Sequence, residues 1–314
     1  MATAAAGATQ HREDRTAMQR VLRALRANGG FFFILPGLVV YLGFIAWPII
    51  ATFYNGFFIW DGISPDREFT GLDHYVRLLT KDRAFRLSIR NNVYWAIITV
   101  VVLSICGFLF AWLLNQRIRM RNAYRAAFFL PVTASLVVIG YTWEFIYQPE
   151  VGMLNHSLRR FGLEELTRVW LADPDVTIFA IILVSLWASL GFWVVVFLAA
   201  LQAVPQDLYD CAAVDGATGF RQMWHVAVPL TMGTTRALWI LGLIRSINAF
   251  ALVFLLSRGG PYHASEVIAY QIYDLAFRTN HTGYASALSI LLLLISAIVT
   301  VIQLLLMRGR RVQL

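Results

Sequence analysis

The chain has little of what a nucleotide-binding protein or an enzyme needs. Its single lysine, Lys81, lies in Leu-Thr-Lys-Asp-Arg, whereas a P-loop needs a lysine that follows a glycine-rich turn and precedes serine or threonine. Any ATP that the function consumes is therefore bound by another polypeptide. The sequence also has no HExxH, no GxSxG and no GxGxxG that opens a helix after a strand, so it offers no zinc-protease, hydrolase or dinucleotide-binding motif.

Cysteine and buried carboxylates are equally scarce. Cys106 falls in an apolar run and Cys211 in a polar segment, so we expect neither a disulfide nor a cysteine-based metal site. Glu144 is the one acid expected inside an apolar run, which argues against a proton relay of several buried carboxylates. In a soluble protein the formal charge of +8 would fit nucleic acid as a partner. The placement of this charge indicates a membrane instead, and we expect no nucleic-acid partner.

Long hydrophobic runs dominate what is present. Hydrophobic residues make up 59% of the 314 residues, and they come in blocks of about 20 or more, the length that crosses a bilayer. The sequence predicts an all-α, polytopic membrane protein with six transmembrane helices. We place these spans near residues 30–57, 90–115, 122–147, 176–203, 229–256 and 282–307.

A single membrane domain over residues 30–307 is expected between two tails. Residues 1–29 form the N-terminal tail, in which arginines and apolar residues from 16 to 27 predict a helix on the membrane surface. No signal-peptide cleavage pattern follows the first apolar run, so we expect an uncleaved first span. Residues 308–314 form the C-terminal tail.

Arginine is unevenly distributed among the predicted loops. The positive-inside rule places short loops rich in basic residues on the cytoplasmic side. One set of segments and adjoining span ends is rich in arginine and carries few acids: Arg12, Arg15, Arg20, Arg23, Arg26, Arg117, Arg119, Arg121, Arg125, Arg221, Arg236, Arg308, Arg310 and Arg311. The sequence therefore predicts that both termini and residues 204–228 are cytoplasmic. Residues 58–89, 148–175 and 257–281 then form the outer loops.

Residues 205–229 form the one long polar segment between apolar runs that still carries sequence patterns typical of helices. Pro205, Gln206 and Asp207 are a helix-start pattern with an acid in the first turn. Glycines at 216 and 219 interrupt the pattern that follows. We expect two short helices joined by a glycine bend, with Gly216 in a backbone conformation that other residues resist. Such a segment can dock in a partner's groove; the alternative is a bent membrane-surface loop without a partner.

This segment resembles the cytoplasmic coupling signature of ABC importer permeases, roughly E-A-A-x-x-D-G-A followed by leucine-proline. It reads Asp210-Cys211-Ala212-Ala213-Val214-Asp215-Gly216-Ala217 and closes at Val228-Pro229. Asp210 and Cys211 replace the usual glutamate and first alanine. Further stretches resemble the maltose-type sugar permeases of type I importers, between about residues 30 and 307: Phe69-Thr70-Gly71-Leu72-Asp73-His74-Tyr75, Phe129-Leu130-Pro131 with Trp143, Gly152 and Asn155, and Ser257-Arg258-Gly259-Gly260-Pro261 followed by Glu266, Tyr270, Ala276-Phe277 and Gly283-Tyr284-Ala285.

The resemblance implies a non-catalytic translocation subunit in the bacterial plasma (inner) membrane, surrounded by lipid. Its partners would be a second homologous permease, two ATPase subunits that bind ATP and magnesium, and an extracytoplasmic substrate-binding protein. The chain itself would hold no cofactor and no metal. The resemblance also implies that six residues couple the chain to the ATPase: Asp210, Ala212, Asp215, Gly216, Ala217 and Phe220.

Polar and aromatic residues inside the fourth and fifth predicted spans are candidates for holding a sugar. Sugars need hydrogen-bonding groups for their hydroxyls and flat aromatic faces for their C–H patches. The candidates are Trp187, Ser189, Phe192, Trp193, Arg245, Ser246 and Asn248. Tryptophans in spans are also typical packing residues, and the serine and asparagine could hydrogen-bond a neighbouring helix. Arg245 could pair with Glu144, with a carbonyl group or with a substrate.

The sugar-contacting positions of maltose-type permeases can also be placed on these spans by counting residues without gaps from the matching motifs. They fall on Ala188, Ser189, Phe192, Gly242, Ser246, Ala249 and Ala251. Gly242, Ala249 and Ala251 offer no polar side chain, so the resemblance implies a mono-, di- or oligosaccharide without implying maltose. Glycerol phosphate or a related phosphorylated polyol is the alternative substrate, because related permeases carry it and Arg245 could bind a phosphate.

Two more distant alternatives lie outside this family. A secondary transporter usually shows repeat symmetry or broken helices, and six unrepeated spans with the segment 205–229 fit that class poorly. A membrane enzyme such as a glycosyltransferase would need a carboxylate or metal-binding cluster at one membrane face. Finally, Gly259-Gly260-Pro261 predicts a turn that ends the fifth span, and contact of this turn with the binding protein is a hypothesis.

Overall fold

The computed structural model of the protein describes residues 29–116 and 118–307. The chain divides between Tyr54 and Asn55 into two compact units, and each is described by itself. The first contains α2 (Gly29–Tyr41), a π-helical turn η1 (Leu42–Ala46) and α3 (Trp47–Asn55) up to the division. The apolar helix Ile34–Asn55 is long enough to cross a membrane, as predicted for the first span. The predicted surface helix of residues 16–27 and the C-terminal tail lie outside the described residues.

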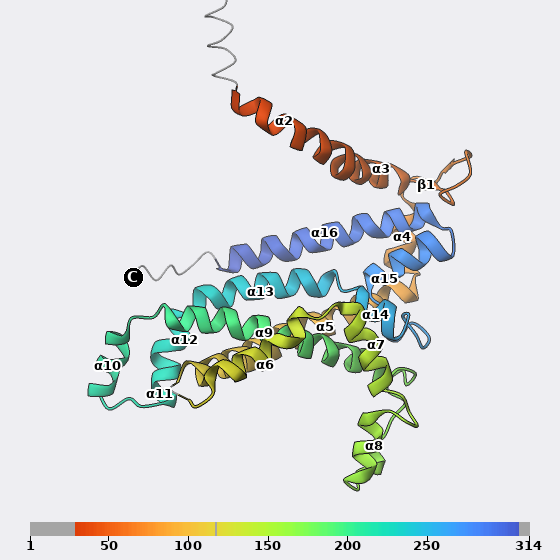
Figure 1. Ribbon diagram of the computed structural model, residues 1–314. Coiled ribbons are helices and arrows are strands. Elements are labelled where there is room, and N and C mark those ends of the chain that lie inside the picture. Colours follow the sequence, from red (N-terminus) through yellow and green to blue (C-terminus); the bar gives the residue numbers. More distant parts are fainter. Residues whose placement is uncertain (1–28, 117, 308–314) are drawn as a thin grey trace, which may run out of the picture. The chain divides into compact units, whose positions relative to one another are not determined.

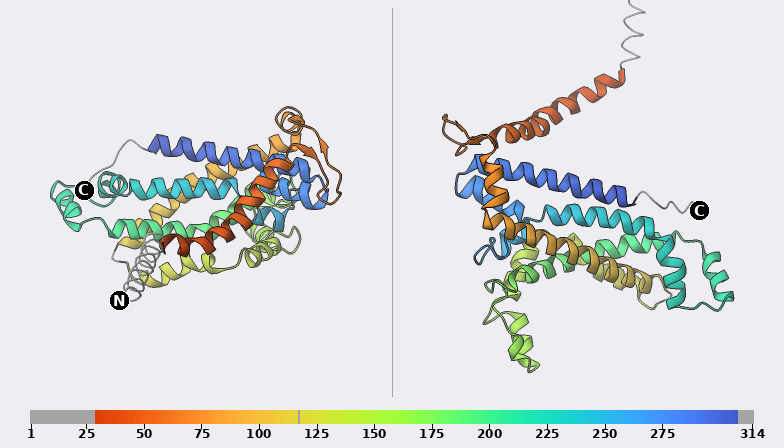
Figure 2. Two further views of the ribbon diagram at one scale, coloured as in Figure 1. Left: turned by 90° about the horizontal axis from the view of Figure 1, so that it is seen from above. Right: turned by 180° about the vertical axis from the view of Figure 1, so that it is seen from behind.

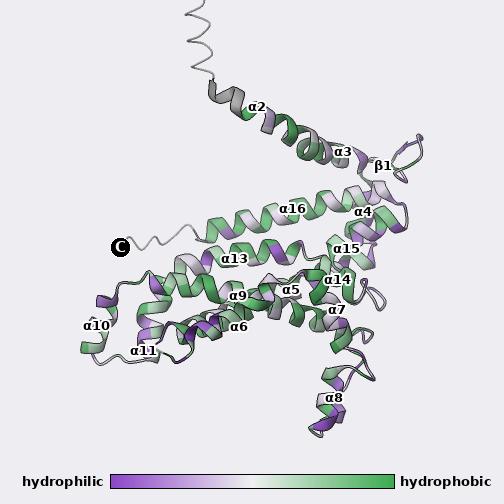
Figure 3. Cartoon of the chain, in the orientation of Figure 1, coloured by the Kyte–Doolittle hydropathy of each residue, from purple (hydrophilic) through white to green (hydrophobic). Residues whose placement is uncertain are grey.

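Four long helices run side by side in the second unit (Figures 1 and 2). They are α5 (Arg83–Asn115), α9 (Thr177–Gln202), α13 (Met232–Ile247) and α16 (Thr282–Met307). Helix α5 packs along both α9 and α13. Apolar residues dominate along these helices, and hydrophilic residues gather at the two ends of the bundle (Figure 3). The all-α polytopic fold is therefore confirmed.

Small residues and one polar contact allow the helices to approach closely. Gly191 on α9 faces α6 (Arg121–Thr133), where an added Cβ would overlap the carbonyl oxygen of Phe128. Only glycine fits at such a backbone contact. On the other side of the bundle, Trp239 Nε1 of α13 donates to Ser104 Oγ of α5 over 2.8 Å. These contacts hold α6, α9, α5 and α13 together.

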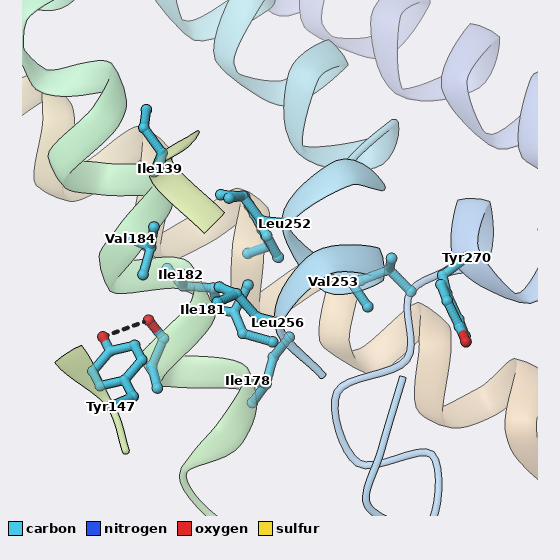
Figure 4. Packing of buried hydrophobic residues seen from close by; sticks show 13 residues of the cluster. Ile139, Tyr147, Ile178, Ile181, Ile182, Val184, Leu252, Val253, Leu256 and Tyr270 are labelled. Atoms are coloured by element: carbon cyan, nitrogen blue, oxygen red, sulfur yellow. Dashed lines mark hydrogen bonds between the residues drawn. The ribbon is translucent and has the colours of Figure 1, made fainter. Parts of the chain in front are cut away.

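An apolar cluster fills the space between α9, α7 (Leu136–Ile146) and α14 (Ala251–Leu256) (Figure 4). Ile181, Val184 and Val253 are fully buried in it. Tyr147 lies at its edge and donates its hydroxyl to the carbonyl oxygen of Ala180 over 3.0 Å. This bond satisfies a buried phenol.

The third span is broken, so its prediction as one helix over 122–147 is wrong. Helices α6 and α7 meet at a bend of 98°. Pro131 lies within the last turn of α6 and lacks an N–H. Ser135 then caps α7 by accepting from the backbone N–H of Val137 over 3.3 Å. Proline followed by an N-capping serine ends one helix and starts another.

Two other predicted spans also differ from the structure. The second begins at Arg83 rather than near 90, because Asp82 caps it by accepting from the backbone N–H of Phe85 over 2.9 Å. The fifth, predicted as one run over 229–256, is interrupted: α13 ends at Ile247 and α14 starts at Ala251. The fourth and sixth, at Thr177–Gln202 and Thr282–Leu306, agree closely with the prediction.

Asn92 of α5 holds the interruption of the fifth span in place. Its amide nitrogen donates to the carbonyl oxygens of Ser246 and Ile247 at the end of α13, over 2.9 and 3.2 Å. Its amide oxygen accepts from the backbone N–H of Ile268, over 3.0 Å, at the start of α15 (Ile268–Tyr273). One buried side chain therefore bonds two helix ends. The Ser246 carbonyl oxygen also accepts from the backbone N–H of Ala249 over 3.3 Å.

The neighbouring Asn91 fixes the loop that follows the fifth span. Its side chain is fully buried and donates to the carbonyl oxygens of Ala264 and Glu266, both over 2.8 Å. The loop itself contains left-handed residues, Arg258 and Gly259 among them. The predicted turn at Gly259-Gly260-Pro261 is thus present.

Short elements form the segments predicted as outer loops. Strands β1 (Phe58–Ile59) and β2 (Glu68–Phe69) pair antiparallel, and α4 (Asp73–Thr80) follows them. An arm carries α8 (Met153–Arg160) and the 3-10 turn η2 (Glu164–Leu166). Its hub is Asn155, which accepts from Trp170 Nε1 over 2.7 Å and donates to the carbonyl oxygen of Arg168 over 2.9 Å. The π-helical turn η4 (Asp274–Arg278) joins α15 to α16.

The polar segment between α9 and α13 forms two short helical elements at one end of the bundle (Figure 1). Helix α10 spans Gln206–Val214. After the bend come α11 (Phe220–Gln222), the π-helical turn η3 (Met223–Ala227) and α12 (Val228–Leu230). Elements α8, α14 and α15 lie at the opposite end.

We predict that Asn92→Ala destabilises the fold, because it leaves the carbonyl group of Ile247 and the N–H group of Ile268 without a partner. Each such group costs roughly 1–3 kcal/mol. Thermal unfolding of the protein in nanodiscs measures the effect. Asn122→Ala, at an exposed position of α6, is the control and is expected to unfold like the wild type. Equal unfolding temperatures for both variants would show that Asn92 does not hold the interruption.

Candidate functional site

The interruption of the fifth span opens into a cavity of about 300 Å³ in the middle of the bundle. Helix α5 contributes Trp95 and Thr99, and α9 contributes Ser185 and Ser189. Leu136 of α7 and several residues of α13 and the segment after it, including Arg245, complete the wall. The cavity therefore combines hydroxyl groups, one guanidinium group and aromatic rings at the level where the helix is open.

A second cavity of about 390 Å³ adjoins the first at the bend of the third span. Pro131 and Ala134 line it near the bend, and Phe192 lines it from α9. Ser189 and Arg245 line both cavities. The two interrupted spans thus open towards the same pair of polar side chains.

The structure brings most of the predicted sugar-binding residues together. Ser189, Trp193, Arg245, Ser246 and Asn248 line the first cavity, and Phe192 lines the second. Trp187 lines neither cavity; it is 43% exposed and packs edge to face on Trp143 at 5.6 Å between ring centroids. The residues carried over from maltose-type permeases each line one of the two cavities: Ala188, Ser189, Phe192, Gly242, Ser246, Ala249 and Ala251.

Two of the polar candidates are engaged within their own helix. Ser246 is buried and donates its hydroxyl to the carbonyl oxygen of Gly242 over 2.8 Å. The Asn248 amide nitrogen donates to the carbonyl oxygen of Ile244, also over 2.8 Å, at the end of α13. Both side chains still present an oxygen that can accept a hydrogen bond from a ligand.

Arg245 is the charged group of this site. Its side chain is exposed to the cavities and makes no ion pair with any residue that the structure describes. Glu144, a possible partner on sequence grounds, lines a different cavity with Arg258. The guanidinium group is therefore available to donate hydrogen bonds to a bound molecule.

Sequence reasoning missed the contribution of α5 to the site. Trp95 and Thr99 are one helical turn apart, and they follow Asn91 and Asn92 along α5. The Thr99 hydroxyl is buried without a hydrogen-bond partner, which suits a group that meets a ligand. The signal in the sequence was polar and aromatic residues at helical spacing inside an apolar run.

The side chains that line the two cavities are suited to noncovalent binding. No nucleophile lies beside a base in either cavity lining, as covalent catalysis requires. No group of three or more His, Cys, Asp or Glu residues that could hold a metal ion occurs within residues 29–116 and 118–307. Hydroxyl groups, a guanidinium group and aromatic walls can hold a polyhydroxylated molecule.

The segment α10–α11 presents the predicted coupling residues at one end of the bundle. Asp210, Asp215 and Gly216 are exposed, and Ala212 and Ala217 are half-buried. Beyond the bend, Phe220 is 68% exposed. Gly216 has φ +80° with open space around it, which confirms the expected left-handed backbone. This surface therefore combines acidic and apolar side chains.

The inner side of this segment is anchored to the bundle. Tyr209 is buried and its ring contacts Trp112 of α5 at 6.1 Å. Burial raises the pKa of the Tyr209 phenol because it disfavours the ionised form. Gln222 Nε2 donates to the carbonyl oxygen of Tyr209 over 3.2 Å and so joins α11 to α10. These contacts attach the α10–α11 segment to α5.

The arrangement described so far is that of a membrane translocation subunit, with broken spans around a polar cavity and an exposed helical segment at one end. Residues 104–312 match the family described as "Binding-protein-dependent transport system inner membrane component". The chain belongs to this family and is an ABC importer permease.

Two relatives show how far the similarity extends. The chain is 34% identical over 275 residues to the probable ABC transporter permease protein YurN of Bacillus subtilis, covering 87% of this chain and 94% of the relative. It is 32% identical over 293 residues to the trehalose/maltose transport system permease protein MalF of Thermococcus litoralis, covering 92% and 97%.

A solved structure shows the same fold. It is a chain of a bacterial ABC transporter involved in the import of the acidic polysaccharide alginate, with a TM-score of 0.79 and 22% identity. The match covers 91% of this chain and 98% of that chain.

Proposed function

We propose that this chain forms part of the pathway for a sugar in an ATP-driven importer. The observation that carries the proposal is the pair of cavities at the two interrupted spans, where Ser189 and Arg245 are shared. Breaks in transmembrane helices expose backbone groups, which membrane proteins tolerate only beside protein or a polar cavity. The hydroxyl groups and aromatic walls fit the alternating polar and apolar faces of a sugar.

The assembly would contain this chain, a second homologous permease, two ATPase subunits and an extracytoplasmic substrate-binding protein. ATP and magnesium would be bound by the ATPase subunits, since this chain has no P-loop. The exposed α10–α11 segment supplies a surface that can enter a groove on an ATPase. Closure of the ATPase pair would move this segment, and with it α5 and α9, to change which side of the membrane the cavities face.

The charge distribution supports one orientation in the membrane. Described arginines near the α10–α11 end include Arg119, Arg121, Arg125 and Arg221. Under the positive-inside rule this end faces the cytoplasm. Both termini would then be cytoplasmic in a bacterial inner membrane, and α8, α14 and α15 would lie on the outer side.

The experiment is uptake by proteoliposomes that contain the complete importer and its binding protein. Maltose, trehalose and glycerol 3-phosphate, each radiolabelled, are supplied with ATP inside the vesicles. We expect ATP-dependent uptake of at least one neutral sugar. Uptake of none of the three in this assay, together with uptake of an amino acid or peptide, would contradict the proposal.

A phosphorylated polyol is the second candidate because Arg245 has no ion-pair partner among the described residues. Arg245→Gln separates the two. We predict that it reduces neutral-sugar uptake less than about tenfold, whereas loss of a charge-assisted contact to phosphate costs about tenfold to hundredfold. Arg160→Gln, at the exposed end of α8, is the control. A wild type that imports only glycerol 3-phosphate, and loses it on Arg245→Gln, would establish the second candidate.

We predict that Gly216→Val uncouples ATP hydrolysis from uptake. Valine strongly disfavours φ +80°, so the bend between α10 and α11 must change. Gly162→Val is the matched control, because Gly162 also has positive φ and open space but lies in the outer arm. Hydrolysis and uptake are measured together in proteoliposomes. Normal coupling of ATP hydrolysis to uptake in Gly216→Val would contradict the proposed role of the bend.

A further inference from the structure

A third cavity, of about 420 Å³, lies at the opposite end of the bundle from α10 and α11. Helix α7 contributes Tyr141 and Glu144, and α15 contributes Tyr270 and Tyr273. Arg258 lines it from the turn after α14. None of these residues belongs to the mid-bundle site, so the cavity needs its own explanation.

Two charged side chains that line this cavity, called the outer cavity below, have no ion-pair partner among the described residues. Glu144 and Arg258 are both exposed, and neither forms an ion pair within the described part of the chain. Arg258 has φ +50°, a conformation that residues other than glycine keep only where the surroundings impose it. Arg278 differs, since it pairs with Asp274 over 2.8 Å and donates to the Tyr270 hydroxyl over 3.3 Å.

Aromatic rings connect the outer cavity to the mid-bundle cavity without a gap. Phe250 lines the mid-bundle cavity and stacks on Phe254 at 5.4 Å between centroids. Phe254 lines the outer cavity and meets Tyr273 edge to face at 5.3 Å. Phe250 also contacts Tyr273 directly at 5.5 Å. Figure 4 shows Tyr270 at the border of the apolar cluster, with its hydroxyl directed away from the cluster.

We propose that the outer cavity is a second saccharide-binding site, which receives a neutral sugar before it passes along Phe250 and Phe254 to the mid-bundle cavity. This inference rests on the proposed sugar-importing function. Tyrosine rings offer flat faces for the C–H patches of a pyranose. A carboxylate and a guanidinium group offer acceptors and donors for its hydroxyls. Glu144 and Arg258 carry opposite charges, and Arg278, which also lines the cavity, is paired with Asp274, so the site favours a neutral ligand over an anion.

Thiol labelling of the complete importer in nanodiscs tests whether sugar occupies the outer cavity. In a Cys106→Ser, Cys211→Ser background, Tyr141→Cys places a thiol in the cavity, and Val151→Cys places one outside it on the arm; both positions are more than 60% exposed. The probe is maltose or trehalose, whichever the wild type imports, at saturating concentration. We expect labelling of Tyr141→Cys to slow about fivefold or more while labelling of Val151→Cys is unchanged.

Uptake by Tyr273 variants tests whether the aromatic face matters. Tyr273→Leu is expected to reduce uptake about tenfold, and Tyr273→Phe to retain it, because phenylalanine keeps the ring face. Co-purification of all subunits and ATP hydrolysis without substrate show that Tyr273→Leu still folds and assembles.

The outcomes separate this inference from the proposed function. If the wild type imports no neutral sugar, the proposed function fails first. If it imports one and labelling of Tyr141→Cys is unaffected by that sugar, or Tyr273→Leu imports normally, the outer site is overturned alone. Protection by glycerol 3-phosphate but not by the neutral sugars would overturn the assignment of a neutral ligand.

Discussion

The hydrogen bonds of Asn92 make the interruption of the fifth span possible. The carbonyl group of Ile247 at the end of α13 and the N–H group of Ile268 at the start of α15 bond to Asn92 rather than to a helix backbone, and inside a membrane an unpaired group of this kind is costly. A single amide side chain satisfies both ends, with distances of 2.9–3.2 Å to Ser246, Ile247 and Ile268. Because Asn92 lies on α5, the longest helix of the described chain, the interruption of the fifth span is fixed relative to α9 and α13.

The interruption determines where polar chemistry can exist in an otherwise apolar bundle. The break after α13 and the bend between α6 and α7 face one another across Ser189 and Arg245. Aromatic residues from Phe250 to Tyr273 then lead to the outer end. At the other end, Tyr209 and Gln222 join the exposed α10–α11 segment to the bundle. The same helices therefore carry both the cavities and the docking segment.

The structural features that could be predicted are those that depend on residues close together in the sequence. The apolar runs correctly predicted the helical class and five spans, with a sixth if the bent pair α6–α7 is one span. Pro205, Gly216 and Gly219 predicted the α10–α11 bend. Long-range contacts did not appear in such patterns. The role of Asn92 depends on groups more than 150 residues away in the chain, and the outer cavity joins α7 to α15. The proline at 131 was visible, but tolerance of proline within a span depends on its neighbours, so the 98° bend could not be foreseen.

Co-purification tests the central claim most directly, which is that the α10–α11 segment couples this permease to an ATPase. The tagged chain is expressed with the genes beside its own, extracted gently, and its partners are identified by mass spectrometry. The account predicts a second permease and a P-loop ATPase with the wild type, loss of the ATPase with Asp210→Lys, and its retention with Asp175→Lys, an exposed acid at the outer end. A chain purified alone, or an ATPase retained equally by both variants, would contradict it.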